Sequence, residues 1–122
     1  MNDRELLELA AKAAGLVIGF SKTSPEQGRP YVWNDEKKKG RWWDPRKDDG
    51  DALRLAVKLR IRLNREINCG CDIVEAIGPE DDNMSCNCST ESIEGDPYAA
   101  TRRAIVRAAA EIGRQMQEGG AA

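Results

Sequence analysis

The chain has 122 residues, a formal net charge of −2 and 33% charged residues. This length predicts one domain, and the near balance of charge argues against binding to nucleic acid or membranes through overall charge. The absence of histidine excludes Ser-His-Asp and Cys-His catalysis and every histidine metal site. No apolar run of roughly eighteen residues is present, so no membrane-spanning helix is expected.

The first predicted elements are a helix and a β-hairpin. Asn2 is a good cap for the helix, and Gly15 is a good stop. Residues 16–20 form a short apolar run rich in β-formers, and residues 31–33 fit the returning strand. Residues 41–45 follow either as a short strand or as an ordered loop.

A second helix and further strands are predicted in the middle of the chain. The helix starts after Asp48 or Asp49, either of which can cap it. Residues 61–67 alternate between apolar and polar side chains, which indicates a strand. Residues 71–77 are a second strand candidate, and residues 86–93 are a third, weaker one.

The predicted fold class is α+β, with three helices packed on a mostly antiparallel sheet as a helix–sheet–helix sandwich. The expected element order is α-β-β-α-β-β-(β)-α. Residues 1–118 form the single domain, and residues 119–122 form a flexible tail. The expected buried residues are Leu6, Leu9, Leu55, Leu59, Ile105 and Ile112.

The last helix opens at Asp96-Pro97, with Asp96 as the cap. At roughly 100° per residue, its apolar face contains Tyr98, Thr101, Ile105, Ala108, Ala109, Ile112 and Met116. The opposite face carries Arg103, Arg107 and Arg114, whose mutual repulsion indicates an anionic partner. Arg103 and Arg107 together suit a phosphate or a carboxylate. The alternative is an ordinary solvated face.

The tryptophan pair Trp42-Trp43, flanked by Arg41 and Arg46, is the second candidate binding feature. Consecutive strand residues point to opposite faces, so at most one tryptophan packs into the core. The other can stack on a nucleotide base or on a partner side chain. Alternatively, it only covers the edge of the domain.

All four cysteines lie in two Cys-x-Cys pairs, namely Cys69, Cys71, Cys86 and Cys88. Two such pairs on adjacent strands could make a Cys₄ zinc site, although the usual spacing in zinc knuckles is Cys-x₂-Cys. Free cysteines also serve as small hydrophobic residues in sheets. We expect reduced thiols and no structural metal.

Three segments together carry a family resemblance. They are residues 43–59, which include Trp43-Asp44-Pro45, the helical residues 99–113, and the opening residues 3–15. These segments resemble small phage and prophage proteins of the phage ABA-sandwich type. The resemblance implies a helix–sheet–helix layering and little chemistry, and residues 64–94 show no family pattern.

Small phage proteins without catalytic machinery are often anti-defence factors, and this context gives the leading functional hypothesis. We expect a non-enzymatic protein that needs no cofactor and sequesters a nucleotide-derived immune signal, as a cyclic nucleotide sponge. Arg103 and Arg107 would contact phosphates, Trp42 or Trp43 would stack a base, and Arg41 could assist. The alternative is a protein–protein inhibitor of a host defence complex, similar to an anti-CRISPR factor, acting through its acidic surface.

The remaining expectations concern partners and compartment. A lean core and a long alanine-rich last helix favour a homo-oligomer. No membrane and no sequence-specific nucleic acid is expected as a partner. The acidic N-terminus lacks the apolar region of a signal peptide, so the host cytoplasm is the expected location.

Overall fold

The computed structural model describes residues 2–68, 70–79, 88–93 and 95–120. The helices are α1 (Asp3–Ala13), α2 (Asp49–Leu59) and α3 (Pro97–Gly120). The strands are β1 (Val17–Phe20), β2 (Pro30–Asn34), β3 (Lys39–Trp42), β4 (Arg62–Asn68), β5 (Cys71–Ile77) and β6 (Cys88–Ser92).

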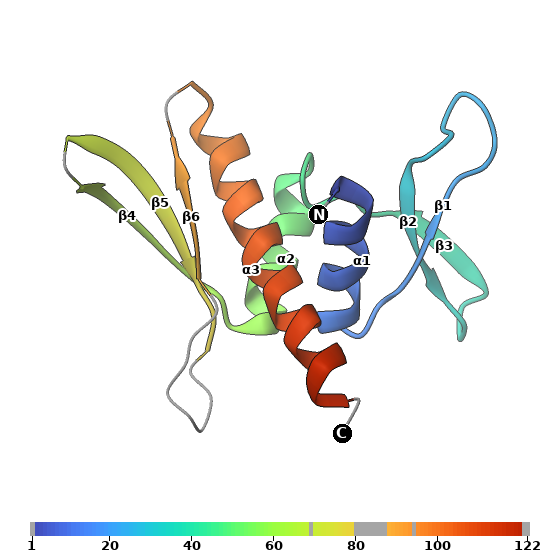
Figure 1. Ribbon diagram of the computed structural model, residues 1–122. Coiled ribbons are helices and arrows are strands. Elements are labelled where there is room, and N and C mark those ends of the chain that lie inside the picture. Colours follow the sequence, from blue (N-terminus) through green and yellow to red (C-terminus); the bar gives the residue numbers. More distant parts are fainter. Residues whose placement is uncertain (1, 69, 80–87, 94, 121–122) are drawn as a thin grey trace.

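The strands form two separate three-stranded antiparallel sheets, β1-β2-β3 and β4-β5-β6. The three helices lie between them, with the first sheet beside α1 and the second beside α3 (Figure 1). The prediction of an α+β fold with antiparallel strands is therefore confirmed. The layering differs from the expected one, because the helices form the central layer, and β3 is a true strand that extends the first hairpin.

Side-chain caps fix the start of each helix where the sequence predicts it. The Asn2 Oδ1 atom accepts from the Glu5 amide at 2.8 Å, and the Asp48 Oδ2 atom accepts from the Asp51 amide at 2.8 Å. Asp96 Oδ1 accepts from two amides at the start of α3, at 3.0 and 3.1 Å. Each cap satisfies donors that have no partner within the helix.

The core is built mainly from small side chains where α1 packs against α3. Ala10, Ala11, Ala104, Ala108 and Ala109 are fully buried, so the two backbones approach closely. The alanine-rich face of α3, which we expected to favour packing against a second copy, is therefore used within the chain. The expectation of a homo-oligomer loses this support and stays a prediction.

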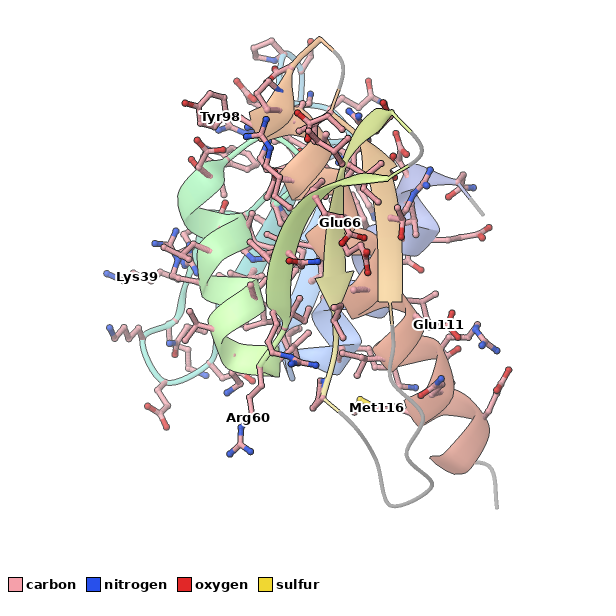
Figure 2. The ribbon with its side chains drawn as sticks, turned by 90° about the vertical axis from the view of Figure 1, so that its left-hand side faces the viewer. Lys39, Arg60, Glu66, Tyr98, Glu111 and Met116 are labelled. Atoms are coloured by element: carbon pink, nitrogen blue, oxygen red, sulfur yellow. The ribbon has the colours of Figure 1, made fainter. Side chains whose placement is uncertain are left out.

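Most of the predicted core residues are buried or half-buried, but the ends of α3 are not. Leu55 and Ile105 are buried, whereas Leu6, Leu9, Leu59 and Ile112 are half-buried, and Leu7 takes the buried position in α1. The assignment of Tyr98 and Met116 to the buried face is wrong, because both side chains are exposed (Figure 2). Neighbouring elements leave Tyr98 at the start of this long helix and Met116 near its end uncovered, although Ala100 in the first turn is buried.

Helix α3 reaches into the segment that the sequence assigns to a flexible tail. Helix α3 continues through Gly120, so the first two of the four residues assigned to the tail are helical. Residues 121–122 lie outside the described residues.

Truncating Ile105 to alanine is expected to lower the free energy of unfolding by about 2–4 kcal/mol, because a side chain that is 3% exposed leaves a cavity. Met116→Ala, at an exposed position on the same helix, should cost less than about 1 kcal/mol. Urea unfolding curves measure both changes. Equal losses for the two variants would contradict the burial of Ile105.

Candidate binding site on α3 and the loop before α2

Arg103 and Arg107 lie one turn apart on α3, beside Glu91 of β6. The Arg107 Nη1 atom is 2.7 Å from Glu91 Oε1, and the Arg103 Nε atom is 3.8 Å from Glu91 Oε2. The Glu91 side chain is 13% exposed, whereas both arginine side chains are about half exposed. Two cations therefore share one nearly buried carboxylate, and the group keeps a net positive charge that faces solvent.

The predicted row of three arginines is interrupted at Arg114. Its guanidinium pairs with Glu111 and, at 2.5 Å, with Glu118 on the neighbouring turns of α3. The hydrogen bond to Glu111 lowers the pKa of that carboxyl. Arg114 thus belongs to a local ion-pair group, and only Arg103 and Arg107 remain as candidate anion ligands.

Arg103 and Arg107 line a cavity of about 270 Å³ between α3, the start of α1 and the loop before α2. Arg46 and Lys47 of that loop line the same cavity. The four cations face one lining carboxylate, that of Asp3. The apolar part of the lining comes from Leu6, Ala99 and Val106. This combination of convergent cations and apolar surface is typical of an anion-binding site.

Arg46 is held rigidly at this cavity. Its Nε and Nη2 atoms donate to the two carboxylate oxygens of Asp44, each at 2.9 Å, and its Nη1 atom is 3.2 Å from Asp3 Oδ2. The hydrogen bonds to Asp44 raise the pKa of Arg46. Its carbonyl accepts from Arg102 Nε at 2.8 Å, which ties the loop to α3.

Lys47 differs from its neighbours, because it forms no ion pair with any residue of the described ranges. Its ammonium group is therefore free to meet a ligand. Sequence reasoning assigned no role to Lys47 or to Arg46 beyond the flanking of the tryptophans. Their position at the arginines of α3 depends on how the loop folds back onto that helix, which no local pattern reveals.

A larger cavity of about 750 Å³ adjoins the first, and Arg46 and Lys47 line both. Trp42 lies in the larger cavity and is 43% exposed. The Arg29 guanidinium lies 4.3 Å from the centroid of its ring, and Tyr31 meets it edge-on. Trp42 therefore provides a partly exposed aromatic surface with a guanidinium over its ring. The lining of this cavity mixes basic side chains with the carboxylates of Glu26, Asp44, Asp48 and Asp51.

Trp43 cannot take part in ligand binding, because its side chain is 2% exposed and belongs to the core. This corrects the sequence analysis, which kept both tryptophans as candidates. The alternation of side chains at the end of β3 separates them as expected, with Trp42 outward and Trp43 inward.

Arg41 lines the larger cavity but is engaged by a buried carboxylate. Its Nη1 atom donates to Asp51 Oδ1 at 3.2 Å, and Arg54 Nη2 donates to the same oxygen at 2.8 Å. The Asp44 amide donates to Asp51 Oδ2 at 2.9 Å. Arg41 thus contributes less free charge than the sequence suggests. Asp51, in the first turn of α2, binds both arginines and the Asp44 amide at this side of the cavity.

Cys71 and Cys88, the two cysteines within the described ranges, are separated along the second sheet. Cys71 pairs with Asn68 at one end of β5, and Cys88 pairs with Ile77 at the other end. Six residues of strand span about 20 Å, so the backbone positions of Cys71 and Cys88 lie much farther apart than those of two ligands of one zinc ion with bonds of about 2.3 Å. Cys69 and Cys86 lie outside the described residues. In the described part of the chain, no group of three Cys, Asp or Glu residues is arranged to hold a metal ion.

Two further findings bear on the function. No helix within residues 2–68, 70–79, 88–93 and 95–120 has both the length and the hydrophobicity needed to cross a bilayer. Comparison of the chain with models of protein families, with curated proteins and with solved structures finds no match.

Proposed function

We propose that this protein binds and sequesters a small nucleotide-derived signal, such as a cyclic nucleotide, without transforming it. The observation that carries the proposal is that Arg46, Lys47, Arg103 and Arg107 line one cavity beside an exposed tryptophan. The resemblance to phage ABA-sandwich proteins adds the proposed setting, a phage-encoded anti-defence protein that acts in the host cytoplasm.

The proposed ligand has its phosphates in the smaller cavity. Charge-assisted hydrogen bonds from guanidinium and ammonium groups to phosphate are among the strongest polar contacts in proteins. Arg103 and Arg107 have only Glu91 to share, and Lys47 has no competing ion pair in the described ranges. A phosphate therefore completes a group that carries excess positive charge.

The base of the proposed ligand lies in the larger cavity. Arg46 and Lys47 line both cavities, so a ligand held there can reach Trp42 with its base. Stacking of a base on an aromatic ring contributes about 1–3 kcal/mol. Neither the phosphate contacts nor the stacking contact involves a side chain that reacts with the ligand. This fits sequestration better than catalysis.

The test is a calorimetric titration with a panel of cyclic dinucleotides, cyclic trinucleotides and their linear counterparts. The ligand that binds should be recovered intact after heat denaturation, in one-to-one proportion to sites. Binding should weaken as salt is added, because the contacts are partly exposed. Failure of every nucleotide to bind the unaltered protein would overturn the proposal and favour the protein–protein inhibitor.

Arg103 and Arg107 are best replaced together with Glu91, the carboxylate that they share. Reversing both charges would leave the nearly buried Glu91 among like charges and risk unfolding. The variant Arg103→Gln, Arg107→Gln and Glu91→Gln keeps the shape and changes the net charge by one unit. Loss of two contacts of roughly 1.5–3 kcal/mol each should weaken binding at least about 100-fold.

Lys39→Gln is the matched control for that variant. It also removes one positive charge, but from β3 at an exposed position away from both cavities. The affinity of Lys39→Gln for the nucleotide should equal that of the unaltered protein. Equal weakening by both variants would show that the ligand responds only to net charge, and the assigned site would be wrong.

A further inference from the structure

Strand β4 is an open edge of the second sheet. It hydrogen-bonds to β5 along its whole length, and no other strand of the described residues pairs with it. Residues 62–67 are all exposed, including Leu63 at 46% and Ile67 at 76%. An edge strand presents a row of unpaired N–H and C=O groups, which can serve as a template for another strand.

The register places each side chain of β4 on a known face of the sheet. Leu63 is opposite Ala76 and Arg65 is opposite Val74, and both partners are buried under the helices. Leu63, Arg65 and Ile67 therefore share the helix side of the sheet. Glu66 lies on the other face, which is turned toward the viewer in Figure 2.

We propose that two copies of this chain associate through their β4 strands, which pair antiparallel about Arg65 and join the two sheets into one continuous sheet. This proposal goes beyond the proposed ligand binding and does not depend on it. In this register, Leu63 of each copy lies opposite Ile67 of the other. Four exposed apolar side chains then meet on the helix side.

Other registers are less favourable for the same strand. The two copies have their helices on the same side of the joined sheet only if the twofold axis passes through a residue position. A register shifted by one residue would turn the second copy over. Centring on Asn64 would put Leu63 opposite Arg65, and centring on Glu66 would put two carboxylates opposite each other. Centring on Arg65 also brings two like charges together, but each guanidinium is already paired with Asp72, 3.0 Å from its Oδ2 atom.

The outer face of the sheet also favours a second copy of β4. Glu66 and Glu75 are neighbours there, and the hydrogen bond between them raises the pKa of Glu75, as expected for crowded carboxyl groups. In the proposed register, Asn64 of the second copy lies opposite Glu66, and Arg62 and Glu66 of the second copy lie on its two diagonals. A second copy therefore places an amide donor directly opposite Glu66, with one cation and one carboxylate farther away.

Sedimentation equilibrium at micromolar concentration tests the association. The unaltered protein should have twice the chain mass of 13.5 kDa, and Leu63→Lys with Ile67→Lys should restore the single-chain mass. Leu53→Lys with Val57→Lys, at equally exposed positions on α2, should leave the dimer intact. A monomeric unaltered protein, or a dimer lost only in the α2 variant, would overturn the proposal.

A cysteine scan tests the register. Directly opposed strand residues have Cα atoms about 4.5–5.5 Å apart, which a disulfide can span. Arg65→Cys should therefore form a disulfide with the same residue of the second copy under mild oxidation. Glu66→Cys should not, because the two substituted positions are offset by two residues along the paired strands. Peptide mapping distinguishes this bond from links through the four native cysteines. Cross-linking of Glu66→Cys alone would exclude the register centred on Arg65.

Discussion

Replacing Gly113 with alanine is expected to lower the free energy of unfolding by about 3 kcal/mol or more. At Gly113 the backbone of α3 lies very close to the backbone of α1. A Cβ atom there would lie 2.7 Å from the carbonyl carbon of Leu9, and closer still to its oxygen. These are backbone atoms that cannot rotate away, so the two helices must move apart and the alanine core around them must open.

The sign of this effect is what makes it informative. In an exposed helix, Gly→Ala stabilises by about 1 kcal/mol, because alanine has the higher helix propensity. Gly50 of α2 is the matched control, since a Cβ there would meet only side-chain atoms of Asp48 and Arg54. Urea unfolding should show a large loss for Gly113→Ala and a change within about 1 kcal/mol for Gly50→Ala. A stabilised Gly113→Ala would refute the close contact.

The helices were predictable because their signals are local. Asn2 and Asp96 cap the helices that follow them, as predicted, and Asp48 is the cap among the two candidates for α2. Capping depends on residues within three positions of each other, so the sequence contains all that is needed. The exposed Tyr98 and Met116 show where this reasoning ends, because burial depends on whether another element covers the position.

The arrangement of the strands was not predictable in the same way. The alternation of residues 61–67 indicates a strand, and β4 covers residues 62–68. Nothing in that pattern says whether β4 joins the first hairpin or forms a second sheet. That choice depends on the path of the chain after α2, where Arg60 takes a left-handed conformation with φ of 57° and Ile61 packs into the core.

The candidate site was predictable only in part. Local patterns marked Arg103, Arg107 and the pair Trp42-Trp43 as candidates, because an arginine pair and adjacent tryptophans are visible in the sequence, but they did not show which tryptophan is exposed. The contacts that set their chemistry come from distant segments. Glu91 reaches the arginines from β6, and Lys47 reaches their cavity from the loop before α2. Such pairings follow from tertiary packing, which the residue spacing does not encode.

Asp51 illustrates a buried acid whose role is structural. Its two oxygens accept from Arg41 of β3, from Arg54 of α2 and from the Asp44 amide of the intervening loop. The carboxylate therefore joins three segments around the larger cavity. Burial alone would raise the pKa of Asp51, but these hydrogen bonds outweigh it and hold the pKa below its ordinary value.

Replacing Asp51 with asparagine is expected to lower the free energy of unfolding at pH 7 by about 3 kcal/mol. Each hydrogen-bond partner of the Asp51 carboxylate is a donor, so the asparagine amide must point its own NH₂ group at a donor. The guanidinium groups of Arg41 and Arg54 also lose the charge of Asp51. Asp48→Asn is the matched control, because Asp48 is mainly a cap and asparagine caps equally well. Its cost should stay within about 0.5 kcal/mol.

The pH dependence separates the charge of Asp51 from its shape. Because its pKa is lower in the folded state than in the unfolded state, its stabilisation is complete above the ordinary carboxyl pKa of about 4. It is lost as the pH falls through the lowered pKa of the folded state. Urea unfolding at pH 7, 5 and 3 should therefore show the gap between the unaltered protein and Asp51→Asn narrowing toward pH 3. A gap that stays constant over this range would mean that shape and hydrogen-bond geometry, rather than the ionised carboxylate, hold β3, the loop and α2 together.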